Sequence, residues 1–134
     1  MNNIFKIILI FSFFNGIVLF AMQEKHNNKT QYQNLMLENG YNAIVTYTKP
    51  LINGENNLTI KILKDNNIVK DADVNIIFEL PHVPNMEFSE HAVEKSGNYN
   101  LNANFKATGE WKYELMFKTD YGVIYSKEGK VTIN

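Results

Sequence analysis

Apolar and polar residues alternate along most of this chain, and this period of two is the feature that most limits its fold. Side chains on a β-strand point to opposite faces in turn, so alternation predicts strands with one buried face. Turn signals such as Asn53-Gly54 and Asp120-Tyr121-Gly122 separate the alternating segments, and no segment has helical spacing. The alternating segments are 41–48, 57–62, 68–69, 74–80, 98–105, 111–118, 123–125 and 131–133. Seven or eight short strands separated by turns predict an all-β chain with an immunoglobulin-like β-sandwich fold.

The segment 98–105 has the most regular alternation in the chain. Its odd-numbered residues are Tyr99, Leu101, Ala103 and Phe105, and its even-numbered residues are all asparagine. We expect the odd-numbered side chains to be buried and the asparagines to face solvent. Trp111, in the next segment, is expected to anchor the core rather than to stack on a ligand.

The composition excludes several classes of function. The chain has 134 residues, enough for one domain with its own core, and it contains no cysteine. Disulfides, iron–sulfur clusters and thiol catalysis are therefore excluded. All thirteen basic residues are lysine, and the net charge is −1. Because arginine is the preferred ligand for phosphates and base edges, we predict that the chain does not bind nucleic acid.

The first 21 residues have the pattern of a secretory signal peptide. Lys6 precedes an apolar run over residues 7–20, and the small residue Ala21 follows it. Leu19 stands two residues before Ala21, at a position where cleaved signal peptides usually have a small residue. The apolar run is also long enough for the alternative, an uncleaved membrane anchor. We therefore predict export to the periplasm or cell envelope, with membrane contact only if residues 1–21 stay attached.

Two further regions follow this segment. Residues 22–40 are mostly polar and are interpreted as a linker. Residues 41–134 contain all the alternating segments and are expected to form the sandwich domain.

A segment rich in proline and histidine, residues 80–91, interrupts the alternation. Pro81 and Pro84 have no backbone N–H to give to a sheet, so we expect an edge strand that leaves regular pairing here. His82, Met86 and His91 carry imidazole and thioether groups, which suit copper better than magnesium or calcium. On a strand, residue 91 lies on the face opposite residues 82 and 86, so a shared metal site requires a bend between Met86 and His91. The alternative is that Met86 packs into the sandwich and both histidines are solvated.

The same segment offers residue types found in hydrolases. Ser89, Glu90 and His91 are adjacent, and adjacent residues on a strand point apart, so they do not form a catalytic triad. The acidic run that includes Glu87 and Glu94 is typical of a solvated face. We therefore predict a non-enzymatic protein.

Several short motifs resemble the YtkA-like or FixH-like domain family over roughly residues 41–134. The matching patterns are Gly54-x-Asn56-x-Leu58-x-Ile60, Ala72-x-Val74, Gly97-x-Tyr99 and Phe105-x3-Gly109-x-Trp111. The resemblance implies a small exported or membrane-tethered immunoglobulin-like sandwich without enzyme activity. It also implies an association, in some members, with heavy-metal transport and with assembly of copper-containing respiratory oxidases.

The chain departs from this family at two positions. The family often has methionine where this chain has Leu80, and again where it has Ala107. Two soft ligands are therefore replaced by aliphatic residues, and His82, Met86 and His91 remain as candidate ligands.

Two functions from different classes follow from the sequence. The first is a domain that binds copper or passes it to a membrane cation pump or an oxidase assembly complex. The alternative is a metal-free interaction module whose sandwich edge docks on a cell-envelope complex.

Overall fold

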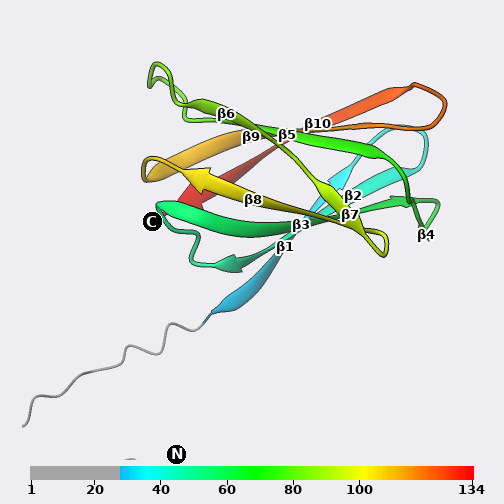
Figure 1. Ribbon diagram of the computed structural model, residues 1–134, viewed down its shortest axis with the longest axis horizontal. Helices are drawn as coiled ribbons and strands as arrows, with labels where there is room; N and C mark the ends of the chain where they lie inside the picture. Colours follow the sequence, from blue (N-terminus) through cyan, green and yellow to red (C-terminus); the bar gives the residue numbers. More distant parts are fainter. Residues whose placement is uncertain (1–27) are drawn as a thin grey trace, which may run out of the picture.

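The computed structural model describes residues 28–134, which form two antiparallel β-sheets packed face to face (Figure 1). The ten strands are β1 (Lys29–Met36), β2 (Tyr41–Lys49), β3 (Gly54–Lys64), β4 (Asn67–Ile68), β5 (Asp73–Glu79), β6 (Glu87–His91), β7 (Val93–Lys95), β8 (Asn98–Phe105), β9 (Gly109–Lys118) and β10 (Ile124–Ile133). The prediction of an all-β sandwich is confirmed. The described strands outnumber the expected seven or eight because β1, β6 and β7 lie outside the alternating segments, although segments 123–125 and 131–133 belong to one strand, β10.

The strand order is that of an immunoglobulin-like sandwich. The larger sheet has the order β1-β2-β3-β8-β7, with β4 attached to β3, and the smaller sheet has the order β10-β9-β5-β6. Immunoglobulin domains pair strands A-B-E-D in one sheet and C-F-G in the other. Here β2-β3-β8-β7 and β5-β9-β10 reproduce those two orders, and β6 extends the second sheet. β1 is therefore an additional strand, placed before the first strand of the immunoglobulin pattern.

The core lies between the two sheets and follows the predicted alternation. In β8 the side chains of Tyr99, Leu101, Ala103 and Phe105 are buried, whereas the four asparagines are exposed or partly exposed, as expected. Trp111 is 1% exposed and makes edge contacts with Phe105, with ring centroids 5.2 Å apart. The prediction that Trp111 anchors the core is therefore confirmed.

One flank of the sandwich is closed by a strand that changes sheets. β6 pairs with β5 in the smaller sheet, and β7, which begins two residues after β6 ends, pairs with β8 in the larger sheet. Ala92, between them, is buried, and its backbone N–H donates to the carbonyl oxygen of Val74 at 2.9 Å. The backbone itself therefore connects the two sheets on this flank.

On the opposite flank the side chain of Gln33 in β1 is one of the connections between the sheets. Its Nε2 donates to the backbone oxygen of Lys130 in β10 at 2.7 Å and to the hydroxyl of Tyr47 at 3.0 Å. The hydroxyl of Tyr113 in β9 donates to Gln33 Oε1. Gln33 therefore connects β1 and β2 of the larger sheet with β9 and β10 of the smaller one.

This finding corrects the interpretation of residues 22–40 as a linker. Residues 29–36 form β1, which pairs with β2 along its whole length, and Leu35 joins the core. The strand is mostly polar because it lies at an edge, where a single apolar residue and a hydrogen-bonded glutamine suffice to fill the inner face. The predicted signal or anchor segment and residues 22–27 lie outside the described residues. Within residues 28–134, no helix is long and apolar enough to span a membrane.

The buried hydroxyl of Tyr113 predicts a loss of stability at alkaline pH. Burial, with a smaller contribution from Tyr47, raises the pKa of Tyr113 above its ordinary value. The unfolded chain ionises its tyrosines near about pH 10, while folded Tyr113 keeps its proton. Its contribution to stability is therefore fully present below about pH 10 and is lost as the pH rises above that value.

We expect the urea midpoint of the wild type to fall between about pH 9 and about pH 11, and to fall less steeply in Tyr113→Phe. The exposed Tyr121→Phe is the matched control and should follow the wild type. Equal slopes for Tyr113→Phe and the wild type would contradict this assignment.

Candidate functional site

The loop between β5 and β6, residues 80–86, carries two of the three candidate ligands. The N–H of Leu80 donates to the carbonyl oxygen of Met86 at 2.9 Å, which joins the two ends of the loop. His82 and Asn85 both have left-handed backbone conformations, with φ values of 65° and 61°. Pro81 and Pro84 lie in this loop rather than in a strand, and regular pairing resumes at Glu87. Figure 1 shows the loop projecting beyond one end of the sandwich.

An aromatic cluster lies beneath the loop. Phe88, two residues after Met86, stacks on Phe78 at a centroid distance of 5.0 Å and packs edge-on against Trp111 at 5.7 Å. Met86 is partly buried and packs against the same core. The cluster therefore provides a rigid apolar base for the loop.

Leu80 and Ala107, the two positions at which the resemblance implies methionine, lie at this same end. A Cβ atom added to Gly109 would be 3.3 Å from Cδ1 of Leu80, and the indole N–H of Trp111 donates to the oxygen of Ala107 at 3.0 Å. Leu80 and Ala107 are both partly buried against the core. The methionine positions of the resemblance therefore lie at the loop end of the sandwich. In this chain they are occupied by aliphatic residues, which cannot bind a metal.

The three predicted ligands are not brought together. His82 is exposed in the loop, and Met86 is its last residue. His91 is the last residue of β6, opposite Asn75 of β5, and β6 is paired without interruption from Glu87 onward. At about 3.3 Å per residue, His91 lies about 16 Å along the strand from Met86. The bend that a three-ligand site requires is absent from this strand, so His91 is not part of a site with the other two.

His91 instead belongs to a small polar cluster on the outer face of the smaller sheet. Its Nδ1 lies 3.1 Å from Asn75 Oδ1 and 3.3 Å from Asp73 Oδ1. Asn75 Nδ2 donates to Asp73 Oδ1 at 3.1 Å, so the amide oxygen of Asn75 is the one that accepts from His91. Both side chains of the His91–Asp73 contact are exposed, and exposed polar contacts of this kind contribute little to stability. In residues 28–134, no group of three or more His, Cys, Asp or Glu side chains is placed to hold a metal ion.

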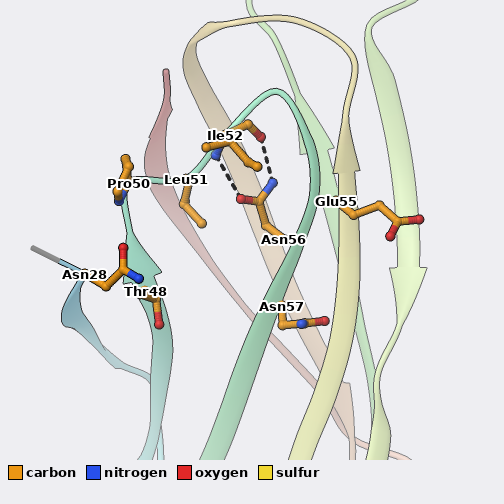
Figure 2. Close-up of a pocket in the computed structure, with 8 residues that line it drawn as sticks. All are labelled: Asn28, Thr48, Pro50, Leu51, Ile52, Glu55, Asn56 and Asn57. Atoms are coloured by element: carbon orange, nitrogen blue, oxygen red, sulfur yellow. Dashed lines mark hydrogen bonds between the residues drawn. The ribbon is translucent and has the colours of Figure 1, made fainter. Parts of the chain in front are cut away.

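A depression of about 490 Å³ lies beside the loop between β2 and β3 (Figure 2). Asn56 is the central residue of its wall: its Nδ2 donates to the oxygens of Ile52 and Gly54, and its Oδ1 accepts from the N–H of Ile52 at 2.9 Å. In Figure 2 the side chains of Glu55 and Asn57 point away from Asn56. The polar atoms of Asn56 are thus used to hold the turn, and the residues around the depression do not converge on a ligand.

Other motif residues of the resemblance also have structural contacts. The hydroxyl of Tyr99 accepts from the N–H of Ala72 at 3.1 Å and donates to the oxygen of Val69 at 2.8 Å. Gly97 has a φ of 80°, and a Cβ there would lie 2.8 Å from Cγ2 of Ile68. These residues therefore fix turns and strand ends, and they identify the fold rather than a binding chemistry.

Sequence reasoning missed Gln33, whose side chain connects the two sheets on the β1–β10 flank. A glutamine in a polar stretch has no distinctive neighbours in the sequence. The available signal was the weak alternation of Gln31, Gln33 and Leu35 with more exposed residues.

The comparisons with known proteins identify the family of this chain. Residues 36–116 match the sequence model of the YtkA-like family, and they make up more than half of the chain. No curated protein and no solved structure matches the chain. Because the match covers the strands from β2 into β9, which form most of both sheets, this chain belongs to the YtkA-like family.

Proposed function

We propose that this protein is an exported, non-enzymatic domain that binds Cu(I) through His82 and Met86 and passes it to a membrane cation pump or a respiratory oxidase. The observation that carries the proposal is that both donors lie in one seven-residue loop, whose ends are joined by the Leu80–Met86 hydrogen bond. The loop projects from the end of the sandwich, and His82 is exposed there.

The chemistry of the two donors fits Cu(I). Thioether sulfur is a soft ligand and imidazole a borderline one, whereas magnesium and calcium prefer oxygen ligands. A pair of donors leaves coordination positions open for ligands from a recipient protein. This supports transfer of copper rather than its permanent retention.

Loss of either donor should weaken Cu(I) binding. We expect Met86→Leu, which nearly conserves volume, and His82→Ala each to weaken affinity about tenfold or more in a competition titration under anaerobic conditions. Met116→Leu is the matched control, because Met116 is also partly buried but lies on the outer face of β9. His91→Ala should leave the affinity unchanged, because β6 holds His91 away from the loop. Equal affinities for the wild type, Met86→Leu and His82→Ala would contradict the copper proposal.

The pH dependence of binding provides a second readout of the same site. Imidazole binds a metal only in its neutral form, whereas a thioether needs no deprotonation. Affinity of the wild type should therefore fall as the pH is lowered, and this dependence should disappear in His82→Ala.

The second candidate is a metal-free interaction module that docks on a cell-envelope complex. It is favoured by one observation, that residues 28–134 bring no three His, Cys, Asp or Glu side chains together as a metal site. It becomes the better account if the copper titration shows no dependence on His82 and Met86.

A further inference from the structure

Apart from the two-residue β4, which pairs only with β3, the described sandwich has four strands at the edges of its two sheets, β1 and β7 in the larger sheet and β10 and β6 in the smaller one. An edge strand exposes unpaired backbone groups, and proteins protect such edges with charged residues that face inward or with short strands. The four edges of the described chain differ in this respect.

Three of the four edge strands carry a charged residue directly opposite a buried one. Directly opposite residues in a sheet share a face, so a residue paired with a buried one faces the core. Lys127 of β10 pairs with buried Leu115, Glu90 of β6 with buried Ile76, and Glu94 of β7 with buried Tyr99. β6 and β7 are also only five and three residues long. These edges therefore resist pairing with another strand.

β1 has this protection only at its first residue, because Lys29 shares the face of Gln31, Gln33 and Leu35 but pairs with exposed Lys49 at the end of the strand. It has eight residues, and from residue 30 to residue 36 none is charged. Its core-facing residues Gln31, Gln33 and Leu35 pair with residues of β2. On its outer face Tyr32 is 69% exposed and Met36 is 75% exposed. Because Gln33 is hydrogen-bonded to β2, β9 and β10, the strand is held in an extended conformation ready for pairing.

We propose that β1 is a homodimerisation strand, which pairs antiparallel with β1 of a second copy to join two larger sheets into one. This inference goes beyond the copper proposal and does not depend on it. A second copy fits because β1 is complementary to itself. One register places Gln33 opposite the same residue of the second copy, and the opposed pairs are then Tyr32–Asn34, Gln31–Leu35 and Thr30–Met36.

No like charges oppose each other in such a pair. The single charged residue, Lys29, lies at the end of the strand, outside the opposed pairs. Opposed like charges destabilise strand pairing, and exposed tyrosine and methionine next to the junction add apolar contact area. An isologous interface of this kind closes on itself and stops at two copies.

Cross-linking at β1 tests the contact directly. The chain has no cysteine, so a single introduced cysteine reports only on contacts of its own position. We expect Asn34→Cys in the full-length chain, purified in mild detergent, to give a covalent dimer with a short bis-maleimide. Asn102→Cys is the matched control, because Asn102 is exposed on β8, an interior strand of the same sheet. The Asn102→Cys chain should remain monomeric. Equal cross-linking at the two positions, or none at Asn34→Cys, would overturn the proposal.

A charge placed on the edge gives an independent readout that needs no cross-linker. Tyr32→Lys should weaken self-association about tenfold or more in sedimentation velocity, because a lysine on an edge strand resists pairing. Tyr121→Lys makes the same change at an exposed position in the β9–β10 turn and should have no effect. The chain that begins at Asn28 should dimerise like the full-length chain. A dimer seen only when residues 1–27 are present would assign the contact to that segment and overturn the role of β1.

Discussion

A chain shortened to begin at Tyr41 should lose about 3 kcal/mol or more of its free energy of unfolding relative to a chain that begins at Asn28. The shortening removes β1, and with it Leu35 from the core. It also removes Gln33, which accepts from the buried hydroxyl of Tyr113 and donates to Tyr47 and to the backbone of Lys130. For a domain with a typical stability of about 5–15 kcal/mol, this is a large fraction of the total.

The measurement is urea denaturation of both chains, followed by the fluorescence of buried Trp111. The point substitution Gln33→Ala isolates the hydrogen bonds and should cost about 1–3 kcal/mol, since it leaves a buried hydroxyl without its acceptor. If the chain that begins at Tyr41 unfolds at the same urea concentration as the longer chain, β1 is not an integral part of the fold.

The second large effect is expected at Gly129 in β10. A Cβ atom added there would lie 2.7 Å from Cε1 of Tyr113 and closer still to Cζ and the hydroxyl oxygen. Tyr113 is 2% exposed and hydrogen-bonded to Gln33, so its ring has no free space to move into. Gly129→Ala should therefore destabilise the fold by about 1–3 kcal/mol, as overpacking in a core does. The position does not have a left-handed backbone, so the cost is one of space.

A double-mutant cycle separates this contact from other effects of the substitution. In a Tyr113→Leu background the ring is gone, and Gly129→Ala should cost much less than in the wild type. An equal cost in both backgrounds would show that the side chain of Tyr113 is not what excludes a larger residue at position 129.

The alternation of apolar and polar residues was sufficient to predict the sandwich and the burial pattern of β8. It was insufficient for β1, because an edge strand buries little apolar surface. The inward position of Gln33 is tolerated only because distant residues, Tyr113 and Lys130, complete its hydrogen bonds. Such long-range partners are not visible in a sequence window.

The sequence was sufficient to locate the candidate site, but not to predict which of its candidate ligands lie close together. Pro81 and Pro84 correctly marked a break in pairing, but that break ends at Met86, and β6 then runs straight to His91. Strand alternation also does not apply to His82, since it lies in a loop with a left-handed backbone. The positions of ligands on opposite sides of a turn depend on backbone angles that residue spacing does not specify.

The two flanks of the sandwich differ in how they resist local opening. On the β6–β7 flank one continuous run of backbone, through Ala92, belongs to both sheets, so separating the sheets there must break backbone hydrogen bonds. On the β1–β10 flank the sheets are joined by the side chain of Gln33 and, at the end of β10, by two backbone hydrogen bonds, from the N–H of Asn134 to the oxygen of Leu51 at 2.9 Å and from the N–H of Asn53 to the oxygen of Asn134 at 3.1 Å. Opening at β1 therefore breaks the hydrogen bonds of one side chain, whereas opening at Ala92 or at Asn134 breaks backbone hydrogen bonds. The loop that carries His82 and Met86 precedes β6 directly, so it lies on the flank where the chain itself crosses between the sheets, next to its aromatic base.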